Sequence, residues 1–207
     1  MASLMESTLS PQQHEMLKAV LIAQTESLGR EETHVIEGIL ARHHCRRVLD
    51  VGCGEGSFLL HLASRMRRTR FVGMDHSELA IRDATLRLEG GACPNVEFRT
   101  AFFDSAYDPA MYDAILTRYT LQHSSDPRGF LRAVADRLAP GGVFACMESL
   151  DAYTDSHERD PVWERFRESI RAIHDRVGSN ANVGKTLGRL LADAGLCLLY
   201  TSDAADE

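Results

Sequence analysis

The stretch VLDVGCGEGSF, residues 48–58, places a loop with glycine at every second position directly after a short apolar run. Glycine permits a positive φ and lets a ligand approach backbone amides that no Cβ obstructs. A dinucleotide-binding fingerprint would need GxGxxG, but Ser57 stands where its third glycine belongs. The stretch therefore predicts a strand, a loop of bare peptide and a helix, and the loop is either a ligand site or a tight structural turn.

A second acid ends the next apolar run, FVGMD, at Asp75. The carboxyl ends of parallel strands meet at one edge of a sheet, where this carboxylate could accept hydrogen bonds from both hydroxyls of a ribose. The alternative role is the N-cap of the following helix, for which Ser77 is better placed. We therefore expect Asp75 to bind a ribose.

Short apolar runs alternate with segments of helical periodicity over the middle of the chain. The expected strands cover residues 46–52, 69–75, 95–104, 112–120 and 143–149. The expected helices cover residues 57–68, 77–90, 126–142 and 182–195. Parallel neighbours need crossover connections, so this alternation predicts an α/β fold. We expect a doubly wound, Rossmann-like and mostly parallel sheet with helices on both faces.

Further segments flank this expected core, residues 45–196. Residues 1–44 carry two amphipathic helices that break near Gly29, and we expect them to form a lid over the cleft. At about residues 150–180 the pattern loosens into an inserted loop and helix. Open α/β sheets bind ligands at the carboxyl ends of their strands, so this insert is a candidate substrate cover.

The composition is that of a globular protein, with 207 residues, 44% hydrophobic, 26% charged and a net charge of −7. This charge points away from nucleic acid as a partner, and the basic run at 65–70 is short. The five cysteines form no CxxC, so we expect reduced, mostly buried thiols and no metal. Neither a signal peptide nor a membrane span is evident, which predicts a cytoplasmic protein without a membrane partner.

Five motifs occur in a fixed order: VLDVGCGEGSF, VGMDHS, FFDSAY, YDAILTRYTLQH and LAPGG. Together they resemble the ordered motifs of class I S-adenosylmethionine-dependent methyltransferases, over roughly residues 46–196. The resemblance implies S-adenosylmethionine as cofactor and methyl transfer to an acceptor. RYTLQH and the later NVGKTLGRLLADAGL resemble a branch that often acts on small molecules. Enzymes that methylate planar amide or base nitrogens usually carry [DN]PP[YFW] after strand four, where this chain has TRYT.

The resemblance also implies which residues hold the cofactor. They are Asp50, Gly52, Cys53, Gly54, Met74, Asp75, His76, Phe103, Asp104 and Thr117. Asp50 would orient the methionine ammonium directly or through water, and Thr117 would offer it a backbone carbonyl. Asp104 would accept from the adenine amine. Glu55 is expected to face solvent.

The loop at 52–54 would give backbone contacts to the methionine and ribose, Asp75 would hold the ribose diol, and Met74 and His76 would flank the adenine. For His76, a place at the start of the following helix is an equal alternative.

Methyl transfer places the acceptor atom in line with the breaking carbon–sulfur bond, so positioning does much of the work. A hydroxyl or acidic carbon acceptor would also need a base, for which His123, Glu148 and His157 are the candidates. Each has a structural alternative: a loop hydrogen bond, a strand-end cap and a solvated side chain, respectively. Arg118 and Tyr119 could bind an acidic acceptor or pack the loop.

Two other function classes stay open. A nicotinamide-dependent oxidoreductase is disfavoured by the missing GxGxxG and by the second acid. A non-catalytic binding module or a truncated relic of the same fold is the other alternative.

Residues 197–207, CLLYTSDAADE, match the in-frame translation of a transposase sequencing adapter at every position. We expect this tail to be non-native, and the natural chain to continue past Leu196 with an antiparallel hairpin of strands six and seven. A natural short tail is the alternative.

Overall fold

The structure is a computed structural model. It describes residues 29, 31–91, 93–104, 110–148, 161, 164–165, 168, 171–172, 175, 178–180 and 182–199. The chain divides into two compact units. The first unit comprises Met1–Arg118 and Arg137–Cys146, and the second comprises Tyr119–Asp136 and Met147–Glu207.

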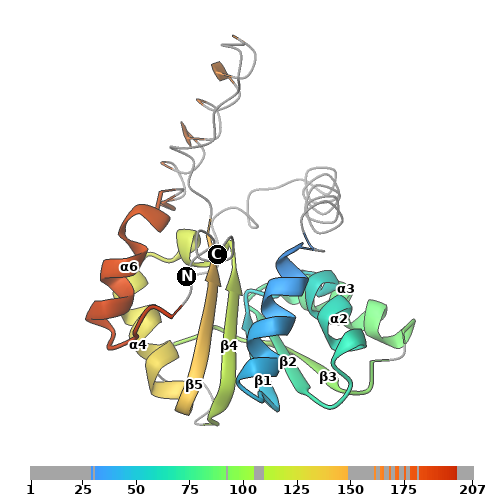
Figure 1. The fold of residues 1–207 in the computed structure, drawn as a ribbon. Helices are drawn as coiled ribbons and strands as arrows, with labels where there is room; N and C mark the ends of the chain where they lie inside the picture. The colour runs from blue at the N-terminus through green and yellow to red at the C-terminus, as the bar shows by residue number, and fades with distance from the viewer. Residues whose placement is uncertain are drawn as a thin grey trace. The chain divides into compact units, whose positions relative to one another are not determined.

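The first unit is built on a five-stranded sheet with the order β3-β2-β1-β4-β5 (Figure 1). Its strands are β1 (Arg47–Val51), β2 (Arg70–Asp75), β3 (Val96–Thr100), β4 (Tyr112–Arg118) and β5 (Leu138–Met147), of which Met147 belongs to the second unit. The pairs β1–β2, β1–β4 and β2–β3 are parallel. The chain runs outward from β1 to β3 and returns to β4 on the other side of β1. This order confirms the predicted doubly wound α/β fold, with its switch point between β1 and β4.

The register brings the ends of the central strands level. Asp50 of β1 pairs with Gly73 of β2 and with Leu116 of β4. Val48 and Leu49 of β1 are fully buried, as the continuous apolar run predicted for a strand covered on both faces. The carboxyl ends of β1, β2 and β4 therefore form one edge, to which the glycine loop and both predicted acids belong.

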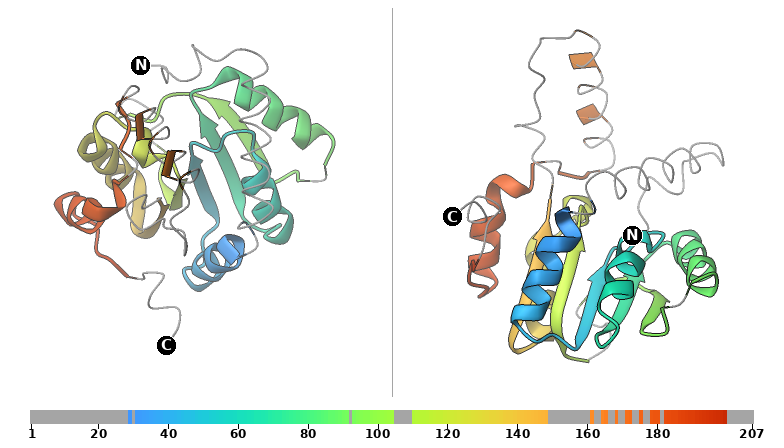
Figure 2. Two further views of the ribbon diagram at one scale, coloured as in Figure 1. Left: turned by 90° about the horizontal axis from the view of Figure 1, so that it is seen from above. Right: turned by 45° about the vertical axis from the view of Figure 1, so that its right-hand side comes forward.

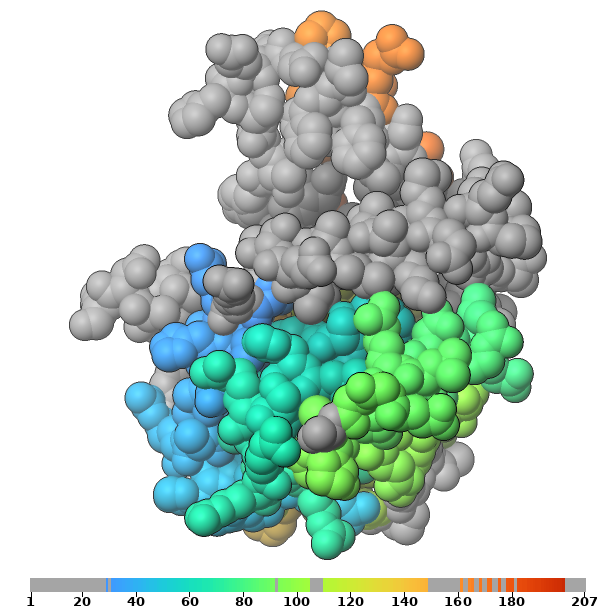
Figure 3. Space-filling view, turned by 90° about the vertical axis from the view of Figure 1, so that its right-hand side faces the viewer, coloured from blue at the N-terminus to red at the C-terminus, as the bar shows by residue number. Residues whose placement is uncertain are grey.

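In the described part of the first unit, three helices accompany this sheet. They are a helix over residues 31–42, α2 (Ser57–Arg65) and α3 (Glu78–Glu89). Ser77 caps α3, because its side chain accepts a hydrogen bond from the Ala80 amide at 3.1 Å, as the sequence predicted. Figure 2 shows the helix over 31–42 beside the sheet, and Figure 3 shows the side of the unit that carries α3 and β3.

Several predicted boundaries were wrong. The helix expected over 126–142 ends at Arg137 as α4 (Pro127–Arg137), and β5 begins at Leu138 instead of residue 143. Pro140 explains this difference, because proline cannot donate to the helix and disfavours helical geometry in the residue before it. The strand expected over 95–104 ends at Thr100, and the helix expected over 57–68 ends at Arg65.

The second unit contains a short 3-10 helix, η2 (Leu121–His123), most of α4, and α6 (Gly184–Asp193). An ion pair between Arg128 and Asp193 joins α4 to α6. The described residues of the insert at 161–175 are helical, whereas 149–160 lie outside the described residues. Residues 1–28 and 200–207 also lie outside them, so most of the predicted lid and tail stays a prediction.

Candidate functional site

The loop after β1 has the backbone that its glycines predicted. Gly52, Gly54 and Gly56 have φ values of 77°, 55° and 77°, in the left-handed region that favours glycine. The amides of Gly52 and Cys53 both donate to the Met74 carbonyl of β2, at 2.7 and 3.0 Å. A Cβ on Gly54 would meet no atom within 4 Å. The loop is therefore fixed to β2 on one side and open beside Gly54.

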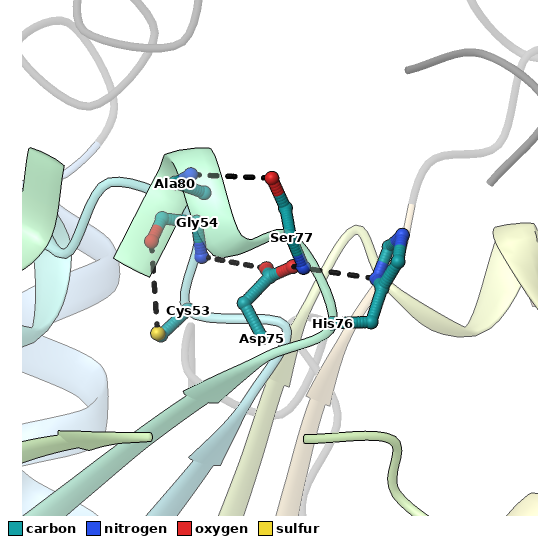
Figure 4. Close-up of polar contacts among 6 residues, drawn as sticks. All are labelled: Cys53, Gly54, Asp75, His76, Ser77 and Ala80. Atoms are coloured by element: carbon teal, nitrogen blue, oxygen red, sulfur yellow. Dashed lines mark hydrogen bonds and ion pairs between the residues drawn. The ribbon is translucent and has the colours of Figure 1, made fainter. Parts of the chain in front are cut away.

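The Asp75 carboxylate is fixed at both of its oxygens (Figure 4). Oδ2 accepts from the Gly54 amide at 3.0 Å, and Oδ1 accepts from the Ser77 amide at 2.9 Å. The imidazole Nδ1 of His76 lies 3.3 Å from Oδ1. The structure thus joins the glycine loop to the second predicted acid, and Oδ2, which accepts from Gly54 alone among the described residues, keeps a lone pair for a further donor.

Asp50 is a buried carboxyl at the end of β1. Burial raises the pKa of Asp50 from an ordinary 3.8 to about 7. The Arg118 guanidinium opposes this rise, whereas the neighbouring carboxylates of Asp75 and Glu55 add to it. A cationic ligand group placed here would stabilise the ionised carboxylate.

Glu55 does not face solvent, and that expectation was wrong. The residue is 8% exposed, and its carboxylate accepts from the Ser57 amide at 3.1 Å and from the Ser57 hydroxyl at 2.5 Å. Gly56, the N-cap of α2, has no side chain to offer the first turn of that helix. Glu55 takes this role, which the positive end of the helix dipole favours.

Met74 and His76, the two residues expected to flank an adenine, lie in different surroundings. The Met74 side chain is buried in the core and its backbone carbonyl accepts from the loop, so contact between Met74 and an adenine stays a prediction. His76 stacks on Phe102, with ring centroids 5.4 Å apart, and Phe102 is exposed. Phe102 is therefore a candidate site residue that the sequence did not single out, although the FF pair before Asp104 was a signal for it.

Phe103 instead lies under the guanidinium of Arg137, 5.4 Å from its ring centroid. Asp104 is exposed at the end of the segment that follows β3. The Ala101 amide donates to the Asp75 carbonyl at 2.9 Å, which ties this segment to the end of β2.

At the end of β4, Thr117 pairs with Val51 and is fully buried, and its hydroxyl has no hydrogen-bond partner among the residues that the structure describes. The next residue, Arg118, forms an ion pair with Glu32, with 2.7 Å between Nε and Oε2. This contact supports the packing alternative for Arg118. Glu32 was missed because 86 residues separate the two partners and nothing local marks Glu32.

The candidate bases belong to the second unit. The Glu148 carboxylate accepts from the amides of Thr120, Leu121 and Gln122, at 3.0, 2.6 and 3.3 Å. Burial raises the pKa of Glu148, and these three hydrogen bonds oppose the rise. His123 is exposed in η2, and His157 lies outside the described residues.

Other expectations concern thiols and membranes. All five cysteines are free, but only Cys45 and Cys93 are buried, so the expectation of mostly buried thiols was too broad. Burial raises the pKa of Cys45 to about 11 and that of Cys53 well above its ordinary value. Of the helices that the structure describes, none is long and apolar enough to cross a bilayer.

These contacts fit a cationic ligand that carries hydroxyl groups. Asp50 offers a buried negative charge, the fixed Asp75 carboxylate offers acceptors, and the space beside Gly54 admits backbone approach. S-adenosylmethionine, with its ammonium, sulfonium and ribose diol, has this chemistry.

Comparison with known proteins points the same way. A family model described as "Methyltransferase domain" matches residues 49–144. The chain is 29% identical over 164 residues to sterol 24-C-methyltransferase erg6 of Aspergillus fumigatus, covering 78% of this chain and 42% of that protein. It is 33% identical over 118 residues to the ubiquinone biosynthesis O-methyltransferase of Idiomarina loihiensis, covering 56% and 45%. The chain thus spans less than half the length of these two relatives.

Among solved structures, the mitomycin 7-O-methyltransferase MmcR is similar in fold, with a TM-score of 0.67 and 16% identity over 90% of this chain and 52% of that one. Residues 49–144 are therefore a methyltransferase domain of the class I, S-adenosylmethionine-dependent type.

Proposed function

We propose that this protein transfers a methyl group from S-adenosylmethionine to a small-molecule acceptor by in-line displacement. The observation that carries the proposal is the Asp75 carboxylate, which two backbone amides hold beside the glycine loop and the buried Asp50. The two relatives named above act, by their names, on a sterol and in ubiquinone biosynthesis. These names support a small-molecule acceptor. We also retain a cytoplasmic location as a prediction.

The cofactor-binding roles follow from where each group lies. Asp50 would receive the methionine ammonium, Asp75 would accept from the ribose hydroxyls, and the peptide at 52–54 would line the methionine and ribose. His76, stacked on Phe102, would present a ring face to the adenine. The remaining assignments, Phe103, Asp104 and the Thr117 carbonyl, stay proposals on position.

The bound donor supplies an activated methyl group on a sulfonium whose charge disappears in the transfer. The protein's task is to hold donor and acceptor in line, and well-oriented reactants recover roughly 7–11 kcal/mol of barrier. Asp50 and Asp75 contribute by fixing two ends of the donor.

An acceptor that must lose a proton needs a base, and His123, Glu148 and His157 remain the candidates. The three amides on Glu148 support a positioning role for that residue in the loop after β4. Its Oε2 also takes the longest of the three contacts, from Gln122. A base function is accordingly best tested first on the histidines.

Binding of S-adenosylhomocysteine to Asp75→Ala, measured by calorimetry, tests the donor site. We expect affinity to fall at least 100-fold, roughly the 3 kcal/mol of two lost charge-assisted hydrogen bonds. Glu97→Ala is the control, because Glu97 is an exposed acid on β3 that pairs with Arg99. Unchanged affinity in Asp75→Ala would contradict the ribose assignment.

Two further comparisons separate the alternative functions. Stabilisation by NADH and not by S-adenosylhomocysteine in a thermal-shift assay would indicate an oxidoreductase. Transfer of tritium from labelled donor to a metabolite extract, followed by mass spectrometry of the product, would distinguish an enzyme from a non-catalytic binding protein.

A further inference from the structure

The ion pair between Glu32 and Arg118 is well shielded from solvent. Its side chains are 15% and 13% exposed, whereas the side chains of Glu37, on the same N-terminal helix, and its partner Arg65 of α2 are 28% and 51% exposed. Exposed pairs contribute little, but a shielded pair fixes its partners and is costly to break from one side. The Glu32–Arg118 contact therefore holds the Arg118 guanidinium in one place.

Three elements of the first unit converge on that guanidinium. Arg118 ends β4, Glu32 comes from the helix over 31–42, and Phe58 of α2 lies under the guanidinium, 5.1 Å from its ring centroid. The planar group is thus bonded at its edge and packed on its face.

The sheet register directs Arg118 toward Asp50. Asp50 pairs with Leu116, and Arg118 follows Leu116 by two residues, so Asp50 and Arg118 project from the same face of the sheet. The other charged groups near Asp50 are Asp75 from β2 and Glu55 from the loop, both acidic, while the Cys53 thiol stays protonated because burial raises its pKa. Among the described residues, Arg118 is the cation that acts on Asp50 in this acidic group.

We propose that Glu32 and Arg118 are positioning residues for donor binding, in which Glu32 holds the Arg118 guanidinium where it keeps the Asp50 carboxylate ionised to receive the donor's ammonium. This inference rests on the proposed function of Asp50. Glu32, on the helix over 31–42, would thus contribute to donor binding without contacting the donor itself.

If Asp50 must be ionised, donor binding depends on pH in a defined direction. Because the pKa of Asp50 is about 7, binding that needs its ionised form strengthens as pH rises through that value. Loss of the Arg118 charge would move this midpoint to higher pH by roughly one unit, the low end of the effect of a nearby opposite charge.

Glu32→Gln separates positioning from simple charge. If Glu32 only competed for Arg118, its neutralisation would strengthen the action of Arg118 on Asp50 and lower the midpoint. If Glu32 positions Arg118, the freed guanidinium moves away and the midpoint rises.

The experiment measures S-adenosylhomocysteine affinity from pH 5.5 to 9.5 for the wild type, Arg118→Gln, Arg118→Lys, Glu32→Gln and the matched control Glu37→Gln. In parallel, NMR follows the Asp50 carboxyl titration in ligand-free protein, and thermal unfolding verifies that each variant is folded. We expect the midpoint to rise in Arg118→Gln, to rise less in Glu32→Gln, to stay near wild type in Arg118→Lys, and to be unchanged in Glu37→Gln.

A midpoint in Glu32→Gln or Arg118→Gln that equals or falls below the wild-type value, in binding and in the NMR titration, would overturn the inference. So would wild-type affinity that is constant over this pH range. Absence of binding by the wild type at every pH would instead reject the proposed function. The NMR titration would still decide whether Glu32 and Arg118 control Asp50.

Discussion

Some single residues of the candidate site are unfavourable for the stability of the fold. Asp50 is the clearest case, because a buried carboxyl at the end of β1 gains nothing from the apolar strands around it. Its pKa of about 7 lies well above the ordinary 3.8, so folding shifts Asp50 toward the protonated form relative to the unfolded chain. The stability it contributes is full below pH 3.8 and is lost as pH rises toward 7.

Asp50→Asn should therefore stabilise the ligand-free protein at pH 8 and change it little near pH 4. The pKa shift sets an upper limit of roughly 4 kcal/mol on the gain at pH 8. Urea unfolding at both pH values measures this difference, with Glu97→Gln as an exposed control. A gain that is equal at both pH values would show that ionisation of Asp50 is not its source.

Among the elements, the loop between β4 and α4 depends on one side chain. Glu148 accepts from three successive amides at the start of η2, and Tyr119, just before it, has a φ of 54° that non-glycine residues rarely adopt. The Tyr119 amide also donates to the Met147 carbonyl at 2.7 Å. The carboxylate thus compensates a loop conformation that is unfavourable by itself.

Glu148→Ala should lower the free energy of unfolding by about 1–3 kcal/mol, because it leaves buried amides without their acceptor. Glu148→Gln keeps one acceptor oxygen and should cost much less at pH 8, where the raised pKa already makes the charge unfavourable. Chemical denaturation measures the free energy of unfolding of each variant. A methyl-transfer assay of Glu148→Gln tests whether Glu148 acts as the base. A folded Glu148→Gln variant without activity would favour Glu148 as the base.

Element types could be predicted from the sequence, whereas some boundaries and contacts could not. Ser77 was recognised as a cap because the cap signal is local. The end of α4 was missed because apolar spacing was followed past Pro140. Glu55 was misplaced because its partners depend on how α2 begins.

For the whole molecule, the strand order and the site edge followed from motif order and from the rules for parallel sheets. The contacts that join distant segments of the chain could not be predicted from those rules. The Glu32–Arg118 pair is one example, and another is Asp113, whose carboxylate accepts from the amides of Arg46 and Arg47 at 2.7 and 2.8 Å. Such pairs depend on tertiary approach, which a single sequence does not record.

Hydrogen exchange should show how local stability varies among the strands. We expect the slowest amides in β1 and β4, whose residues are buried and paired, and faster exchange in the edge strand β3. Saturating S-adenosylhomocysteine, at about 100 times its Kd, should add roughly 2.7 kcal/mol to globally exchanging amides. Native-state exchange followed by mass spectrometry measures both, and slower exchange in β3 than in β1 would contradict this order.

The two amides on Asp75 have a consequence for selectivity. A side chain already tethered at both oxygens cannot rotate away when an incoming sugar lacks a hydroxyl. We therefore expect a 2′-deoxy or 3′-deoxy analogue of the donor to bind more weakly than the ribose form, because one Asp75 oxygen would lose its water without gaining a hydroxyl donor.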